Sequence, residues 1–247
     1  MWNFLYQLAS PKAFYQLTER WLFWLLMAAC FTLTIGVGLG LFFAPSDYQQ
    51  GDAFRIIYVH VPCAFLSMGL YAFMGFLSIL VLIWRIKMAG IVLRMTVPTG
   101  MVMAFLALVT GSIWGKPMWG TWWIWDARLT SELILLFIYA AILATGQAYQ
   151  NKDQGDKMVS ILTLVGLVDL PIIHYSVYWW NTLHQGATLS LIAKPKIDSA
   201  MLYPLLLTLL GFSFYCAYVI LLKTRDELLQ RERRQHWVRI LIEGQES

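Results

Sequence analysis

Hydrophobic positions gather in six long runs, separated by short polar or aromatic connections. The runs lie at about 21–43, 61–84, 92–114, 129–149, 158–179 and 201–222. Each run is long enough to cross a bilayer as a helix, which needs about 20 residues. The pattern predicts an all-α integral membrane protein with six transmembrane helices. Because no repeat or low-complexity linker divides the chain, residues 1–247 are expected to form a single membrane domain.

The composition agrees with a membrane protein. Only 13% of the residues are charged and 59% are hydrophobic, whereas soluble domains carry about 25% charged residues. The net charge of +4 does not indicate a nucleic-acid partner, because basic residues at membrane edges give the same sum. The three cysteines are far apart and form no CxxC pair, so neither a zinc site nor a redox dithiol is predicted.

Lys and Arg are unevenly divided between the two sides of the predicted bundle. Thirteen belong to the termini and to the second-to-third and fourth-to-fifth connections, and five belong to the other side. Basic residues concentrate on the cytoplasmic side of membrane proteins. Both termini are therefore expected in the cytoplasm, and the connections at about 44–60, 115–128 and 180–200 are expected to face outward.

One outward connection, WGKPMWGTWWIWDARLT at residues 114–130, is very rich in tryptophan. Its aromatic and charged residues are Trp114, Trp119, Trp122, Trp123, Trp125, Asp126 and Arg128. An aromatic belt at the bilayer interface needs only one or two rings per helix end, so this density favours a binding surface over a belt. The stretch also has helical spacing, because positions i, i+3, i+4 and i+7 are occupied by Trp119, Trp122, Trp123 and Asp126. Because Pro117 suits the first turn of a helix, the stretch is predicted to form a short interfacial helix with an aromatic face.

An aromatic face edged with charge implies a ligand that is large, flat and mostly apolar, with some negative charge. Heme fits this description, since its macrocycle packs on indole rings and its propionates suit the bidentate guanidinium of arginine. Arg128, and as a second choice Arg55, are the arginines expected to take the propionates. A quinone or an aromatic drug would also pack on indoles, so iron ligands are needed to separate these cases.

Two of the four histidines lie on the outward side with the tryptophans. His60, in YVHVPCAF, lies at the start of the second helix, and His184, in WWNTLHQG, follows the fifth. Two imidazoles can ligate one heme iron, so these histidines are candidate metal ligands. His174 is the competitor, because it lies within the fifth run, where titratable groups are often functional; the alternative is a structural role in which it satisfies the carbonyl freed by Pro171. Asp169 lies deeper in the same run and is expected to be protonated or hydrogen-bonded to a neighbouring helix. His236 is expected to be a surface residue of the inner tail.

Residues 114–130 resemble the WWD signature of heme-handling membrane proteins. Three segments narrow the resemblance: FAPSDYQQGDAFRIIYVHVPCAF, LVTGSIWGKPMWGTWWIWDARLTSELILL and LPIIHYSVYWWNTLHQG. They closely resemble the heme exporter protein C family of bacterial inner membranes, which serves cytochrome c maturation, and the likeness covers nearly the whole chain. His60 and His184 match the family's heme-ligating histidines, and residues 114–130 match its heme platform.

The resemblance implies a heme-transfer protein that is not an enzyme. Proteins of this family hold heme b at the outer face of the inner membrane, in contact with membrane lipid. They hand it to a membrane-anchored periplasmic heme chaperone. They work beside the membrane and ATPase subunits of an ABC transporter and a small single-span subunit.

The residues themselves leave two rivals to heme transfer. A membrane cytochrome b usually buries its ligands within a helix bundle, whereas His60 and His184 are expected at helix ends. A transporter that moves heme through its own helices needs polar groups along its spans, and the predicted spans contain few of them. The sequence therefore favours handover of heme at the outer face.

Overall fold

The computed structural model describes residues 10–184 and 197–243, and in these parts the chain is helical apart from turns and an isolated bridge between Asp47 and Gly51. The elements follow in the order α2 (Pro11–Gly38), η1 (Leu39–Phe43), η2 (Asp52–Ile56), α3 (Ile57–Trp84), α4 (Lys87–Trp119), α5 (Ala127–Ala148), α6 (Lys152–Gly166), α7 (Asp169–Trp179), α8 (Ser199–Arg231) and α9 (His236–Glu243). The predicted all-α class is confirmed.

Within the described residues, six stretches of helix are long and apolar enough to cross a membrane, which confirms the predicted spans. They are Pro11–Phe43, Asp52–Trp84, Lys87–Trp119, Ala127–Ala148, Lys152–Trp179 and Ser199–Arg231. Most are longer than the apolar runs that predicted them, because a helix continues into polar residues as long as its backbone hydrogen bonds are made.

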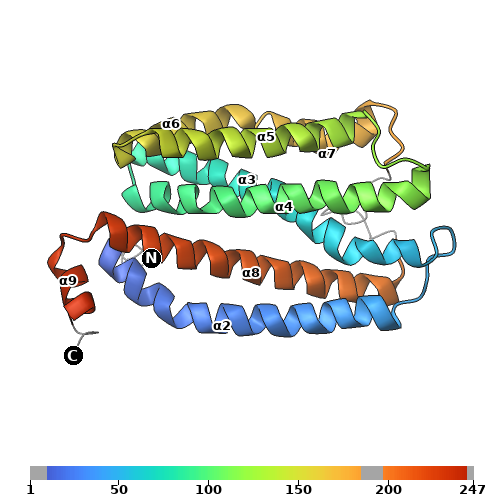
Figure 1. Ribbon diagram of the computed structural model, residues 1–247, viewed down its shortest axis with the longest axis horizontal. Coiled ribbons are helices and arrows are strands. Elements are labelled where there is room, and N and C mark those ends of the chain that lie inside the picture. The colour runs from blue at the N-terminus through green and yellow to red at the C-terminus, as the bar shows by residue number, and fades with distance from the viewer. Residues whose placement is uncertain (1–9, 185–196, 244–247) are drawn as a thin grey trace.

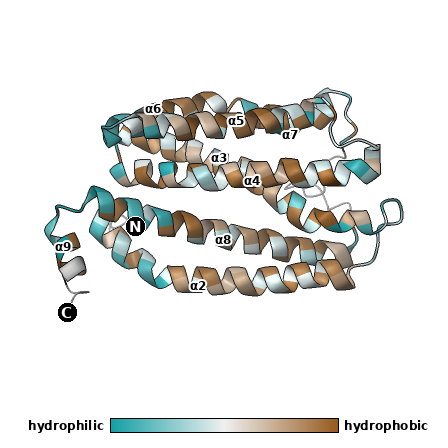
Figure 2. Cartoon of the chain, in the orientation of Figure 1, coloured by the Kyte–Doolittle hydropathy of each residue, from teal (hydrophilic) through white to brown (hydrophobic). Residues whose placement is uncertain are grey.

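The helices lie side by side in three tiers (Figure 1). α2 and α8 form one tier, α3 and α4 form the middle tier, and α5 with α6 and α7 forms the third. The largest buried cluster joins the middle and third tiers, where the Tyr71 and Tyr139 rings meet edge-on at 5.1 Å. Figure 2 shows hydrophobic residues along the middle of the helices and hydrophilic residues gathered toward the ends of the bundle. The three cysteines are free, and Cys63 and Cys216 are buried in one cluster.

Small residues allow α2 and α8 to pack closely. A Cβ atom added at Gly36 would lie 2.8 Å from the backbone nitrogen of Thr208. One added at Gly211 would lie 2.7 Å from Cγ of Leu33. Lipid tails are as apolar as the helix surfaces, so helices in a membrane gain little from the hydrophobic effect when they associate. They associate instead through close van der Waals packing, which small residues permit.

The fifth span is broken between α6 and α7 at residues 167–168. Pro171 lacks the N–H group that would bond to the Leu167 carbonyl, and this carbonyl accepts from the Leu170 N–H at 3.2 Å instead. Asp169 is buried at the start of α7, and its Oδ2 atom has no hydrogen-bond partner within the described parts of the chain. His174 is exposed and packs edge-on against Tyr175, with ring centroids 4.8 Å apart.

Buried ion pairs join α4, α6 and α8 near the end of the bundle where α2 begins and α8 ends (Figure 1). Asp156 on α6 accepts from Arg94 Nη1 at 3.3 Å and from Arg231 Nη1 at 2.7 Å. The exposed fractions of these three side chains are 7%, 9% and 13%. Arg231 also pairs with Glu227 at 2.9 Å. Because an unpaired buried charge is costly, the network fixes the three helices relative to one another.

Candidate functional site

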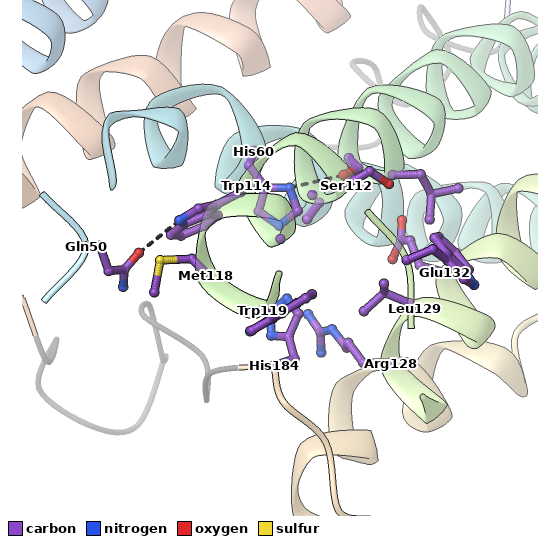
Figure 3. Close-up of a pocket in the computed structure, with 16 residues that line it drawn as sticks. Gln50, His60, Ser112, Trp114, Met118, Trp119, Arg128, Leu129, Glu132 and His184 are labelled. Carbon is purple, nitrogen blue, oxygen red and sulfur yellow. Dashed lines mark hydrogen bonds between the residues drawn. The ribbon is translucent and has the colours of Figure 1, made fainter. Parts of the chain in front are cut away.

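A cavity lies between α3, α4 and α5 (Figure 3), at the end of the bundle where α4 ends and α5 begins (Figure 1). Its wall consists of Gln50, His60, Ala64, Ala107, Leu108, Gly111, Ser112, Trp114, Gly115, Met118, Trp119, Trp123, Arg128, Leu129, Glu132 and His184. His60 and His184, three tryptophans of the 114–130 stretch and Arg128 therefore meet in one place. The cavity holds about 80 Å³, whereas pockets for small molecules usually hold about 300–1,000 Å³. A large flat ligand would have to part its walls.

His60 projects into this cavity from the first turn of α3, with its Nδ1 atom engaged behind it. That nitrogen lies 3.1 Å from the Ala107 carbonyl oxygen and 3.1 Å from Oγ1 of Thr110. The carbonyl can only accept, and the Thr110 hydroxyl already donates to the Leu106 carbonyl at 2.6 Å. Nδ1 must therefore carry the proton, and the lone pair of the neutral ring lies on Nε2, the nitrogen that remains for a metal.

The fit beneath His60 depends on a glycine and a tryptophan of α4. A Cβ atom added at Gly111 would lie 3.0 Å from Cε1 of His60. The Trp114 ring meets the imidazole edge-on, with centroids 5.6 Å apart. Trp114 is fixed in turn, because its indole N–H donates to Oε1 of Gln50 at 2.9 Å. These contacts determine the direction of the imidazole before any ligand is bound.

His184 faces His60 from the connection after α7. The two ring centroids are 6.4 Å apart, and the Trp119 ring lies 6.3 Å from His184. The backbone N–H of His184 donates to Oγ1 of Thr182 at 3.0 Å, and the Thr182 hydroxyl donates to Oδ2 of Asp126. The connection that carries His184 is therefore anchored to the start of α5.

Asp126 is an anchor and does not line the cavity, which differs from the expectation that it edges the ligand surface. Besides the bond from Thr182, its Oδ1 atom accepts from the Leu129 N–H at 2.8 Å and caps the N-terminus of α5. An aspartate at this position supplies an acceptor to the unpaired N–H groups of the first turn. Its contribution to the site is indirect, through the placement of Thr182 and His184.

The predicted short helix over the tryptophan stretch is wrong. α4 continues through Pro117 to Trp119 and ends at Gly120, whose φ of 75° lies in the left-handed region. Glycine adopts this conformation readily, and it is a common end for a helix. Residues 120–126 then form an irregular connection to α5. Trp119, Trp122, Trp123 and Asp126 do have helical spacing in the sequence, but a helix that contained all four would also contain Gly120, where α4 ends in the left-handed conformation.

Because the stretch is not a helix, its tryptophans point in different directions. Trp114 and Trp119 reach the cavity from α4, and Trp123 reaches it from the connection. Trp122 and Trp125 lie outside the wall, with exposed fractions of 56% and 75%. The Trp123 indole N–H is buried and has no acceptor within the described residues.

The two candidate arginines are placed differently. Arg128 lines the cavity from the first turn of α5, and its Nη1 atom donates to the Ile173 carbonyl of α7 at 2.7 Å. Arg55 does not reach the cavity. It pairs with Asp52 at 3.1 Å and donates to the Gly40 carbonyl at 2.8 Å, so it secures the connection between α2 and α3.

Sequence reasoning missed four polar or polarizable members of the wall: Gln50, Ser112, Met118 and Glu132. Glu132 is buried and accepts from the Ser67 hydroxyl at 2.8 Å. It lies one helical turn after Arg128, and this i, i+4 spacing is the signal that could have identified it. Glu132 gives the deep side of the cavity a carboxyl group within reach of the Arg128 charge.

Comparison with known proteins identifies the family. The sequence model of the family described as heme exporter protein C matches residues 4–239. A heme exporter protein C from Escherichia coli (strain K12) is 49% identical over 242 residues, which cover 98% of each chain. One from Haemophilus influenzae is 45% identical, covering 98% of this chain and 99% of its own. One from Bradyrhizobium diazoefficiens is 42% identical, covering 93% and 87%. The chain therefore belongs to the heme exporter protein C family.

Proposed function

We propose that this protein binds heme b in the cavity between α3, α4 and α5 and hands it to a membrane-anchored periplasmic heme chaperone. The relatives are named for heme export, and the cavity offers the donors that a heme needs. On this proposal the protein lies in the bacterial inner membrane with both termini in the cytoplasm and the cavity at the periplasmic side. It serves c-type cytochrome biogenesis as a transfer protein with no turnover chemistry of its own.

The facing imidazoles carry the proposal. A ring nitrogen binds a metal at about 2.0–2.1 Å and lies about 1 Å from its own ring centre, so two axial imidazoles hold their centroids about 6 Å apart. The His60 and His184 centroids are 6.4 Å apart. The Nδ1 bonds of His60 to Ala107 and Thr110 orient its ring and leave Nε2 for iron, as outer partners of metal-bound histidines commonly do.

The remaining wall suits the rest of the molecule. Trp114, Trp119 and Trp123 offer apolar faces to the macrocycle. Arg128 uses one N–H group for the Ile173 carbonyl, and the other groups of its guanidinium are suited to a propionate. Heme would supply the iron and the vinyl groups, and this chain would supply two imidazoles, the apolar faces of three indole rings and a positive charge.

Exposed aromatic rings beside the cavity suit a docking partner. Trp122 and Trp125 flank the wall residue Trp123 and are more than half exposed, and tryptophan is enriched among the residues that dominate binding at protein interfaces. We assign this rim to the heme chaperone. The membrane and ATPase subunits of an ABC transporter and a small single-span subunit are the further partners we propose, and co-purification from native membranes would identify them.

Transfer can be tested with two purified proteins. When heme-loaded protein in detergent is mixed with the heme chaperone and the two are separated, we expect heme to leave with the chaperone. A chaperone variant without its heme-binding histidine is the control and should return without heme. Retention of heme by this protein in both mixtures would instead support a membrane cytochrome b that keeps its cofactor for electron transfer.

Sidedness can be tested by labelling in spheroplasts. Tyr48 lies in the connection before α3 with an exposed fraction of 90%, so Tyr48→Cys in a Cys30→Ser background should react with an impermeant maleimide. Arg233→Cys, in the turn between α8 and α9, should react only after the membrane is ruptured. The reverse pattern of labelling would place the cavity in the cytoplasm and contradict the proposed location.

A further inference from the structure

A second hollow lies on the membrane-facing side of the same region, between α4 and α5. It is an open apolar groove of about 490 Å³. One wall is formed by Phe105, Val109 and Ile113, which follow one face of α4, and the other by Leu133 and Leu136 of α5. The three α4 side chains have exposed fractions of 54%, 38% and 50%. Both helices are spans of the bundle, so the groove opens sideways toward lipid.

The groove and the histidine cavity are adjacent and share part of their walls. Leu108, Ser112 and Trp123 belong to the walls of both. Trp123 comes from the irregular connection and not from a span, so its ring can move without breaking a helix. The partition between the groove and the two imidazoles is therefore one tryptophan ring and two small or apolar side chains of α4.

We propose that this groove is a lateral port through which heme passes between the outer leaflet of the membrane and the site between His60 and His184. The port deepens the proposed function and rests on it. Heme is an amphiphile whose macrocycle partitions into apolar surroundings. The groove is lined mostly by apolar side chains, and the cavity on the other side of Trp123 is lined by an arginine and two imidazoles, so the two hollows together match that polarity.

An unpaired polar group of Trp123 supports the passage of heme past this residue. The Trp123 indole N–H is buried without an acceptor within the described residues, and a buried unpaired donor usually costs about 1–3 kcal/mol. A propionate oxygen passing from the groove to Arg128 would supply the missing acceptor. The other walls are held by bonds already made, between Trp114 and Gln50 and between Thr182 and Asp126.

The alternative occupant is a lipid acyl chain, which fits any apolar groove in a membrane. An acyl chain needs no access to the imidazoles, so the two occupants differ in what happens when the groove is filled. Filling a port slows the arrival of heme. Filling a lipid site leaves the arrival of heme unchanged.

The test uses the full protein in lipid nanodiscs, with heme dissolved in the lipid beforehand. Stopped-flow absorption follows the appearance of the low-spin bis-histidine spectrum. Leu136→Trp and Val109→Trp fill the groove from opposite walls. Ile134→Trp and Phe137→Trp are matched controls, because both lie on α5 with exposed fractions of 46% and 63% but outside the groove.

For the groove variants we expect the rate of heme loading to fall by about tenfold, while the final spectrum stays unchanged. The control variants should load at the wild-type rate. Trp123→Phe keeps a ring but removes the N–H group and should also slow loading. Loading at wild-type rate in both groove variants would overturn the port and support an acyl chain as occupant. A wild-type protein that never develops the bis-histidine spectrum would overturn the proposed function and the port together, so the two failures are distinguishable.

Discussion

Replacing His184 or His60 with alanine should abolish the low-spin bis-histidine absorption of the heme-loaded protein. The two ring centroids are 6.4 Å apart, and on the proposed ligation the loss of either imidazole would leave the iron with one protein ligand. We expect a shift to a high-spin spectrum and at least partial loss of heme during purification. Added imidazole should restore the low-spin spectrum, because it refills the vacated position without changing the fold.

His174→Ala is the matched control for this experiment. His174 is exposed on α7 and lies outside the cavity wall, so its removal should leave the spectrum intact. An unchanged spectrum in His184→Ala would refute the ligand assignment. Thr182→Val should give an intermediate result with weakened low-spin absorption, since His184 keeps its ring but loses its link to Asp126. Thr182→Ser keeps the hydroxyl and should behave like the wild type.

Asp156→Asn should produce the largest loss of stability. The substitution leaves Arg94 and Arg231 with no carboxylate between them, although both are at least 87% buried. Breaking a buried ion pair by removing one partner typically costs about 3–5 kcal/mol. For a chain of this size that corresponds to a fall in the unfolding temperature on the order of 10 °C, measured by thermal unfolding in detergent.

Asp153→Asn is the matched control for Asp156. Asp153 lies in the exposed first turn of the same helix, where loss of the charge costs at most about 1 kcal/mol through the helix dipole. Equal unfolding temperatures for the two variants would mean that the ion pairs do not stabilise the bundle. If the folded Asp156→Asn protein keeps its heme absorption, the ion pairs contribute to the stability of the bundle and not to heme binding in the cavity at its opposite end.

The spans could be predicted from the sequence because burial in lipid constrains every residue of a 20-residue stretch at once. Runs of that length leave few alternatives, and all six proved to be helices. The break at residues 167–168 was harder, because Pro171 is compatible with both a kinked helix and two separate ones. The apolar pattern continues through the break and gives no sign of it.

The site was predictable in part, for a related reason. Imidazole and indole groups are rare enough to identify the connections that meet, so His60, His184, Trp114, Trp119, Trp123 and Arg128 all line one cavity. Side-chain direction was not predictable. Gly120 ends α4 through a single backbone angle, and this turns Trp122 and Trp125 outward. Arg55 was expected to bind a propionate, but its guanidinium pairs with Asp52 and donates to the Gly40 carbonyl. The contact with Gly40 depends on the fold and could not be predicted from the sequence.

The pairing of α2 with α8 has a consequence for synthesis of the chain. A ribosome delivers α2 to the membrane before any other described span, and α8 after all of them. Yet Arg225 of α8 lies over the Tyr15 ring at 3.7 Å and donates to the Thr18 hydroxyl at 3.2 Å. Until translation is nearly complete, the Gly36 face of α2 meets only lipid or a chaperone of membrane insertion. An unfinished chain therefore has a first helix without the partner against which it packs in the complete fold.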